Sequence, residues 1–308
     1  MNRTNDFSRR NFLKGVAMTA LAGAPVVNAL AQTTETLSKS EVYVGKGSAS
    51  EIIPKIIEKM GGMGRFVKQG ARVMIKPNMS FANPPEWATT TSPEAVAVLA
   101  ELCIKAGAKR VIVCDNTLRD GDICKEKSGI AAALKSLKGV VIFTPQQENM
   151  FIEKTSDKAK YLTKTAVVKE MLNCNTLISL PCAKSHAAGG VSLNIKGLMG
   201  LIYDRGTFHR DMDINMGIAE QLYYIKPDLC LVDATRALID NGPAGPGTVS
   251  QLKTFIAGTD AVATDSFATT LAPWYGRQFE GKNVLYLKHA AALGFGNVES
   301  AGIKEIAV

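Results

Sequence analysis

The chain has 308 residues, of which 46% are hydrophobic and 21% are charged, and its formal net charge at pH 7 is +8. This is the composition of an ordinary globular protein, and it excludes a disordered or fibrous chain. The six cysteines are irregularly spaced and include no Cys-x-x-Cys pair. We therefore expect no disulfide scaffold, no zinc ribbon and no iron–sulfur cluster held by the chain itself.

The first 31 residues have the pattern of an export signal. Residues 8–14 read Ser-Arg-Arg-Asn-Phe-Leu-Lys, residues 15–24 are mainly apolar, and Ala29-Leu30-Ala31 forms a small-residue cleavage site. Paired arginines in this setting are typical of the twin-arginine signal. We therefore expect export by the twin-arginine translocase, cleavage near Ala31, and a periplasmic protein without stable membrane insertion. An uncleaved anchor is the alternative, although this stretch is shorter than the ~20 apolar residues that a span needs.

The charge of the remaining chain indicates what it binds. The signal carries four basic residues and one acidic residue, which leaves +5 for residues 32–308. These basic residues are scattered singly, without a polybasic run, so we expect no nucleic-acid partner and favour a small anionic molecule. The twin-arginine route carries folded proteins, many of which hold a cofactor. This favours a bound metal or organic cofactor of unknown identity.

Residues 32–308 predict a single α/β domain. Short apolar runs predict strands at 42–44, 72–75, 110–114, 140–143, 177–180, 229–232 and 253–256. Longer patterns between them predict helices at 50–60, 93–106, 128–137, 164–172, 191–202, 214–225 and 260–271. This alternation predicts a mainly parallel sheet, and the nearly continuous apolar strands indicate that helices cover both of its faces.

Polar side chains follow four of the predicted strands. In open parallel sheets, ligands bind outside the carboxyl ends of the strands, so these positions are candidates for a ligand pocket. The candidates at these ends are Lys76, Asn78, Asp115, Cys182, Lys184, His186 and Asp233. Asn241 begins a loop rich in glycine and proline that we expect on the same side. The alternative is that polar residues end strands simply as turn formers.

The segment from Lys184 to Asp213 concentrates groups that can carry chemistry. Gly189 and Gly190 precede the helix predicted at 191–202, where the backbone could approach an anion, although a plain tight turn explains a glycine pair equally well. His186 and His209 flank that helix and could act as acid, base or metal ligand. Cys182, four residues before His186, is the one cysteine that we consider for catalysis.

Two further basic residues in this segment have candidate roles. Lys196 lies off the apolar stripe of the predicted helix, and a lysine desolvated among cations can act as a nucleophile or form a Schiff base. Arg205 could bind a carboxylate or phosphate through two parallel hydrogen bonds. Lys184 completes the predicted reactive side. The alternative is a solvated basic loop with ordinary surface lysines.

A set of short motifs in fixed order resembles a known family. The motifs are Leu180-Pro181-x-x-Lys184-Ser185-His186, Ile195-Lys196-Gly197-Leu198-Met199-Gly200, Arg205-x-x-x-His209, Lys226-Pro227-Asp228-Leu229, Asn241-Gly242-Pro243 and the run from Gly258 to Asp265. Together they resemble the domain-of-unknown-function family numbered 362, from about Val42 to the C-terminus. Some members carry an appended ferredoxin segment, and this chain lacks its cysteines.

A second resemblance concerns the order of reactive residues. His186, a glycine pair, Lys196 and His209 follow one another as in the N-terminal domain of lactate racemase-type enzymes. Those enzymes attach a nickel-pincer cofactor to a lysine. The resemblance implies that Lys196 would hold the cofactor, that His209 would touch the metal and that His186 would move a proton. We expect no counterpart here of the second catalytic domain of those enzymes.

These observations leave several function classes open. We expect an exported enzyme that acts on a small anionic substrate with a cofactor or metal, most naturally an oxidoreductase. The first alternative is a periplasmic ligand-binding, cofactor-binding or maturation protein without turnover. The second is an enzyme like a racemase or epimerase, with a metal cofactor attached to a lysine. The third is a structural partner in a larger exported complex.

Overall fold

The computed structural model describes residues 39–308. The predicted twin-arginine signal and its cleavage site lie outside these residues, so the signal stays a prediction. Within residues 39–308, no helix is both long enough and apolar enough to cross a membrane.

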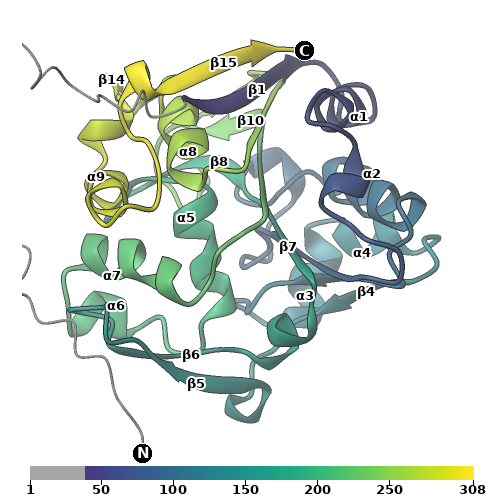
Figure 1. The fold of residues 1–308 in the computed structure, drawn as a ribbon, viewed down its shortest axis with the longest axis horizontal. Coiled ribbons are helices and arrows are strands. Elements are labelled where there is room, and N and C mark those ends of the chain that lie inside the picture. Colours follow the sequence, from purple (N-terminus) through teal and green to yellow (C-terminus); the bar gives the residue numbers. More distant parts are fainter. Residues whose placement is uncertain (1–38) are drawn as a thin grey trace, which may run out of the picture. The chain divides into compact units, whose positions relative to one another are not determined.

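A large sheet runs through the middle of the described fold (Figure 1). Its main path is β15-β1-β12-β10-β7-β2-β3-β4. These strands are β15 (Ile303–Ala307), β1 (Ser40–Lys46), β12 (Thr254–Gly258), β10 (Leu229–Leu238), β7 (Thr176–Leu180), β2 (Arg72–Pro77), β3 (Arg110–Cys114) and β4 (Val140–Phe143). Pairing is parallel along this path except at β12, which is antiparallel to β1 and β10. The prediction of a mainly parallel sheet is confirmed.

Short strands extend the sheet on the side of the candidate residues. β8 (Cys182–His186) continues the chain from β7, pairs in parallel with β10 and forms a hairpin with β9 (Gly190–Ser192). β11 (Val249–Ser250) pairs with the end of β10. Two small separate sheets are formed by β5 (Phe151–Thr155) with β6 (Lys164–Val168), and by β13 (Pro273–Trp274) with β14 (Arg277–Gln278).

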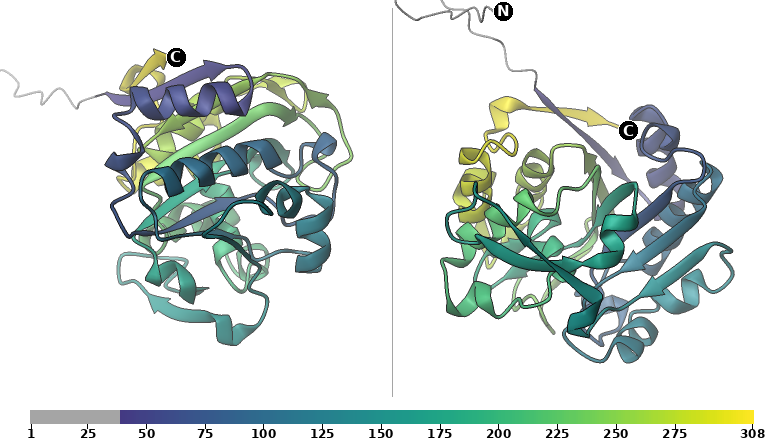
Figure 2. Two further views of the ribbon diagram at one scale, coloured as in Figure 1. Left: turned by 90° about the vertical axis from the view of Figure 1, so that its right-hand side faces the viewer. Right: turned by 60° about the horizontal axis from the view of Figure 1, so that its bottom comes forward.

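Helices cover both faces of the sheet, as Figure 2 also shows. On one side lie α1 (Ala49–Lys59), α2 (Pro93–Lys105), α3 (Gly121–Lys127) and α4 (Ile130–Leu134). On the other lie α5 (Asn194–Gly197), α6 (Thr207–Arg210), α7 (Ile214–Glu220), α8 (Ala261–Thr269) and α9 (Leu285–Ala292). Alternate strand residues face opposite ways: Val73 and Ile75 belong to the core cluster under α1 and α2, whereas Met74 belongs to the other cluster. The strands are apolar throughout because both faces are buried.

All seven predicted strands are present, but one predicted helix is wrong and another begins later than predicted. Residues 164–172 form β6 and a 3₁₀ turn, because Lys164–Val168 pairs with β5 and buries Val167 and Val168. In the segment predicted as helix 191–202, Val191 and Ser192 pair with β8, so α5 begins only at Asn194. In both places pairing with another strand outweighs the local helical pattern.

Candidate functional site

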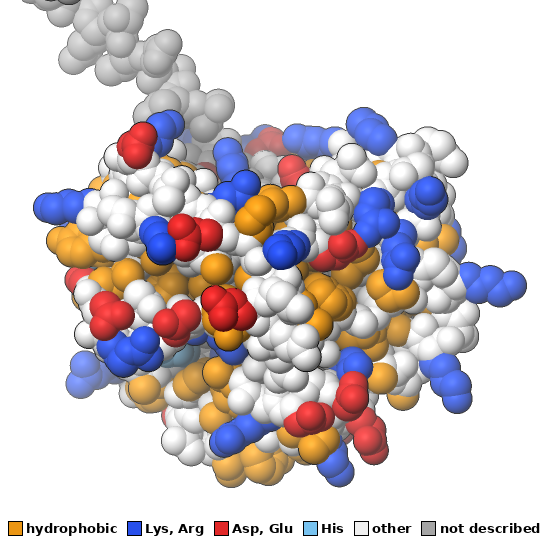
Figure 3. All heavy atoms as spheres, turned by 90° about the horizontal axis from the view of Figure 1, so that it is seen from below, with side chains coloured by type: hydrophobic (Ala, Val, Ile, Leu, Met, Phe, Trp, Pro, Cys, Tyr) orange, Lys and Arg blue, Asp and Glu red, His pale blue; other side chains and the backbone are white. Residues whose placement is uncertain are grey.

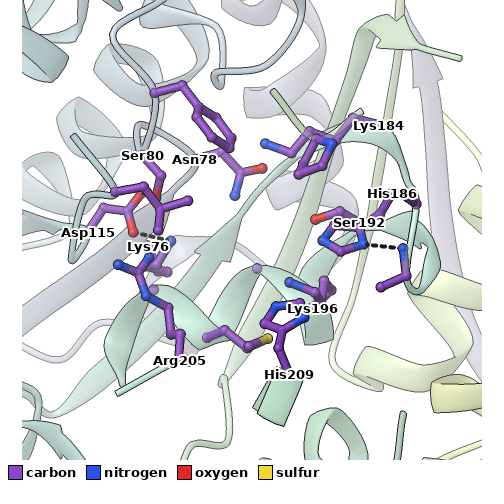
Figure 4. A pocket seen from close by; sticks show the side chains of 18 of the residues that line it. Lys76, Asn78, Ser80, Asp115, Lys184, His186, Ser192, Lys196, Arg205 and His209 are labelled. Atoms are coloured by element: carbon purple, nitrogen blue, oxygen red, sulfur yellow. Dashed lines mark hydrogen bonds and ion pairs between the residues drawn. The ribbon is translucent and has the colours of Figure 1, made fainter. Parts of the chain in front are cut away.

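A cavity of about 450 Å³ opens at the carboxyl edge of the parallel strands. It brings together eight of the candidate residues, namely Lys76, Asn78, Asp115, Lys184, His186, Lys196, Arg205 and His209 (Figure 4). They come from the ends of β2 and β3, from β8, from α5 and from the α6 region. The grouping follows from the topology, because neighbouring parallel strands end at the same edge.

We call this whole cavity the cationic pocket. Its floor holds a buried ion pair. Lys76 Nζ lies 3.1 Å from Asp115 Oδ1, and both side chains are almost fully buried. Asp115 Oδ2 also accepts hydrogen bonds from the Met79 N–H and the Ser80 hydroxyl. A Cβ at Gly200 would overlap Asp115 Oδ1 and lie 2.5 Å from Lys76 Cε, so only glycine leaves room for this pair.

Lys184 is a buried cation without a carboxylate partner among the described residues. Its Nζ donates a 2.6 Å hydrogen bond to the Thr89 carbonyl and lies 5.6 Å from the centre of the Phe81 ring. Burial lowers the pKa of Lys184. Because a buried charge is costly unless it is paired, this side chain is well suited to an anion in the pocket.

Lys196 is presented by α5, and the start of this short helix is held from two sides. The Asp265 carboxylate accepts the backbone N–H groups of Asn194 and Ile195, both at 2.9 Å. The Gln221 side chain donates to the Ile195 carbonyl at 2.7 Å. Burial lowers the pKa of Lys196 to about 7, and Lys184 and Arg205 act in the same direction. Lys196 is therefore the lysine of this pocket best suited to act as a free amine.

The tautomer of His186 follows from its backbone contacts. Its Nδ1 accepts the N–H groups of Ala188 and Gly189, each at 3.2 Å. The neutral ring therefore carries its proton on Nε2 and acts as a hydrogen-bond donor there. Burial lowers the pKa of His186 to about 3, and Lys196 and Lys184 add to the effect. This arrangement favours a neutral His186 that donates from Nε2, and the roles of acid–base group and metal ligand stay predictions.

His209 and Arg205 complete the pocket on the side of α6. His209 is exposed, and burial of its inner face together with Lys196 lowers its pKa. Of the two histidines in the pocket lining it is the more accessible to solvent. Arg205 is partly buried, its Nη2 lies 3.4 Å from the Thr117 carbonyl, and it points toward Lys76 and Asp115 (Figure 4).

The charges around the pocket are unbalanced. Among the described residues that line it, four cationic side chains face one carboxylate, Asp115. Elsewhere the charges are mixed: on the face drawn in Figure 3, basic side chains are dispersed among acidic and apolar ones. An unbalanced set of desolvated cations favours a bound anion.

Five candidate residues lie outside the pocket lining. Cys182 begins β8 rather than a loop and is 1% exposed. Its thiol donates to Asn78 Oδ1, and burial raises its pKa, which disfavours a reactive thiolate. Gly189 ends the turn between β8 and β9, and Gly190 begins β9, so neither lies at a junction with a helix and the predicted helix N-terminus for an anion is wrong.

The other two are structural. Asp233 accepts the Ser92 N–H at the start of α2 and is 1% exposed. Asn241 is exposed and donates to the Pro246 carbonyl within its own loop, whose Pro243 lines the pocket instead. Sequence reasoning missed other lining residues, chiefly Ser80, Phe81, Leu118, Ser192 and Met199. Only the position of Ser80, shortly after β2, could have indicated one of them.

No cluster of three or more His, Cys, Asp or Glu side chains suited to a metal ion occurs within residues 39–308. The lining of the pocket includes two histidines, His186 and His209. Two ligands are fewer than the three or four that a protein normally provides to a zinc ion.

The chain is similar to proteins that share its fold. The thylakoid-associated protein sll1697 of Synechocystis is 28% identical over 243 residues, which are 77% of this chain and 73% of that protein. The solved lactate racemase apoprotein from Thermoanaerobacterium thermosaccharolyticum matches with a TM-score of 0.50 and 13% identity, over 77% of this chain and 58% of that one. The chain therefore spans just over half the length of that racemase.

A solved protein from Thermotoga maritima matches more weakly, with a TM-score of 0.41 and 11% identity over 82% of this chain and 60% of that one. A family model, the domain of unknown function DUF362, matches residues 73–270, which include every residue of the cationic pocket. The mainly parallel sheet, the ordered motifs and this match agree: the chain belongs to the DUF362 family.

Proposed function

We propose that this chain is an enzyme that isomerises a small organic carboxylate in the cationic pocket, as a racemase or epimerase does. The observation that carries the proposal is Lys196, an amine with a pKa of about 7 in a pocket where cations outnumber carboxylates. About half of such amines are unprotonated at pH 7, and a free amine can act as a nucleophile or as an attachment point. The fold shared with lactate racemase supports the same reaction class.

The charged side chains and the two histidines of the pocket each have a role in this proposal. Lys184 and Arg205 bind the carboxylate, and the Lys76–Asp115 pair holds the floor of the pocket. His186 donates a hydrogen bond from Nε2 to a substrate oxygen, since its Nδ1 is occupied by backbone N–H groups. His209 is accessible and moves the proton.

The pocket fits an organic anionic cofactor better than a bare metal ion. Lys196 offers an amine for attachment, and the unpaired Lys184 offers a counter-charge for an anion. When bound, such a group would supply the electron-accepting chemistry that inversion of a hydroxy acid requires and that no side chain here has.

Mass spectrometry and a chirality assay together test the proposal. Protein purified from its native host should carry an added mass on Lys196 and should invert at least one member of a panel of 2-hydroxy carboxylates, as followed by chiral chromatography. Lys196→Met should lose the adduct and lower the rate by at least about 100-fold. The exposed Lys288→Met is the matched control and should keep both. Unmodified Lys196, with no inversion of any panel member, would contradict the proposal.

One observation favours a non-catalytic binding protein as the second candidate. With a pKa of about 3 and a saturated Nδ1, His186 is a fixed donor, which suits recognition of a ligand as well as it suits catalysis. A binding protein would return its ligand chemically unchanged after prolonged incubation. An oxidoreductase is the alternative enzyme class. It would oxidise or reduce a 2-hydroxy carboxylate of the same panel instead of inverting its stereocentre.

We propose that the chain is exported by the twin-arginine route. The support is the pattern of residues 8–31, from the paired Arg9 and Arg10 to Ala31. Replacing both arginines by lysine should retain the protein in the cytoplasm with its first 31 residues uncleaved, as fractionation and N-terminal sequencing would show. Export at the wild-type rate by the double variant would contradict this route.

A further inference from the structure

A second hollow adjoins the mouth of the cationic pocket. This outer hollow is lined chiefly by Phe81, Asn83, Trp87, Arg119 and Ile123. Phe81 lines both spaces. Along two other segments the lining passes from one space to the next at consecutive residues, from Leu118 to Arg119 and from Pro243 to Ala244. The two spaces are therefore neighbours along three stretches of chain.

Large apolar side chains are exposed at this junction. Trp87, Leu118 and Ile123 are 36%, 55% and 49% exposed, and they come from three different segments. Next to them, Phe81 lies under the charged end of Lys184, so one aromatic ring touches both the cationic and the apolar space. An apolar surface continuous with a charged pocket fits a ligand that has both characters.

The walls of the outer hollow are held in place by hydrogen bonds. The Asn83 side chain donates to the Thr89 hydroxyl at 3.1 Å and to the Ala244 carbonyl at 2.9 Å, which ties the turn before Trp87 to the loop that contains Pro243. Arg236 donates to the Pro85 carbonyl on the other side of the same turn. The carboxylate of Asp120 is occupied in capping α3. A preformed surface of this kind costs little ordering when a ligand binds.

We propose that the ligand of this protein is a two-part organic anion: its charged group lies in the cationic pocket, and a flat aromatic or similarly apolar group lies in the outer hollow against Trp87. The proposal rests on the anion-binding role of the cationic pocket given above. A small acid that ends at the carboxylate would leave these apolar walls in water, so we expect it to bind more weakly than a two-part anion. The ligand is thus larger than the reacting carboxylate, as a substrate or a cofactor with a ring would be.

Two probes that share a charged group separate the two halves of this site. Inorganic phosphate tests the cationic pocket, and 1-naphthyl phosphate tests both spaces, with affinities measured by titration calorimetry. The wild type should bind 1-naphthyl phosphate at least about tenfold more tightly than phosphate. Trp87→Ala and Ile123→Ala should each remove most of this advantage while leaving the affinity for phosphate within about twofold. Leu285→Ala, an equally exposed apolar position on α9, is the control and should change neither affinity.

The outcomes distinguish failure of the two proposals. If phosphate binds but 1-naphthyl phosphate gains nothing, or if the gain persists in both hollow variants, the outer hollow is not a ligand site and the cationic pocket stands. If 1-naphthyl phosphate binds equally well to Lys184→Met, the two spaces do not share one ligand, which overturns the two-part inference. If neither probe binds the wild type, both the anion pocket and its extension are wrong.

Discussion

The Asp265 carboxylate accepts the backbone N–H groups of Asn194 and Ile195, the two residues directly before Lys196. Asp265 lies on α8, about 70 residues further along the chain, and its side chain is fully buried. It therefore fixes the first turn of the helix that carries the candidate amine. Burial raises the pKa of Asp265 to about 7, and the N–H donors act against this rise.

Asp265→Asn should weaken this anchor, because the new amide turns one acceptor into a donor that faces N–H groups. An unsatisfied buried donor costs about 1–3 kcal/mol, and each kcal/mol lowers the Tm by roughly 2–4 °C in a chain of this size. Thermal melts measure the loss, and the rate of acetylation of Lys196 reports whether α5 has moved. Asp157→Asn, at an exposed position, is the control. An unchanged Tm together with unchanged Lys196 reactivity would show that Asp265 does not position α5.

The reactivity of Lys196 should depend on pH in an unusual range. With a pKa of about 7, its acetylation by acetic anhydride should be half-maximal near pH 7, whereas an unperturbed lysine side chain needs a pH near about 10.4. Peptide mass spectrometry measures Lys196 and a lysine-containing reference peptide in one sample. Added phosphate should shift the Lys196 midpoint upward, because an anion stabilises the charged amine. Labelling of Lys196 only above pH 9 would contradict the free-amine assignment.

The same pKa determines how Lys196 affects folding. Between about pH 7 and the unfolded-state value near 10.4, the unfolded chain binds a proton at Lys196 that the folded chain does not, so stability rises with pH in this window. Below about pH 7 the amine must be charged in its desolvated site. Lys196→Met should therefore raise the Tm at pH 6 by several degrees, and the gain should shrink toward pH 10. A variant that melts below the wild type at pH 6 in anion-free buffer would refute this account.

Gly200→Ala should disrupt the Lys76–Asp115 pair, since the added methyl group would overlap Asp115 Oδ1. Forcing a group into a packed site costs about 1–3 kcal/mol, so the Tm should fall and phosphate binding should weaken. Gly64→Ala is the matched control, because a Cβ there has open space around it and the backbone is not left-handed. Equal melting temperatures for the two variants would mean that the floor of the pocket tolerates the methyl group.

The two histidines of the pocket should differ in a nuclear magnetic resonance titration. The chain has three histidines, so their signals are readily assigned. His186 should show the neutral Nε2–H form without change from pH 5 to 8, because its pKa is about 3 and its Nδ1 accepts two N–H groups. His209 is exposed, and burial of one face together with Lys196 lowers its pKa, so its signals should move when the solution is acidified. Protonation of His186 near pH 6 would contradict its role as a fixed donor.

Sequence patterns predicted the architecture well where they reflected burial. The central strands were recognisable because helices bury both of their faces, which requires apolar residues at consecutive positions such as Val73, Met74 and Ile75. The strand 164–168 was predicted as helix, since nothing in that segment indicates its pairing with Phe151–Thr155. Local periodicity carries no information about a partner strand.

For the candidate site, too, the sequence predicted some residues correctly and could not separate them from residues with a structural role. The order of the strands along the chain, together with the rule that ligands bind at their carboxyl ends, was enough to nominate Lys76, Asp115 and Lys184. It nominated Asp233 equally, although that carboxylate holds α2 instead. Polar residues at strand ends look alike in a sequence, and only the contacts that they make separate a pocket residue from a structural one.

The sequence by itself determined the fold class, the family motifs and the edge of the sheet where reactive groups gather, because these depend on residue type and order. Only the tertiary structure decided the chemistry of each group. Burial lowers the pKa of the Lys196 amine, and cations from β2, β8 and the α6 region lower it further. Two backbone N–H groups that donate to Nδ1 place the proton of neutral His186 on Nε2. Desolvation and charge act through space, so residues far apart in the chain set these properties together.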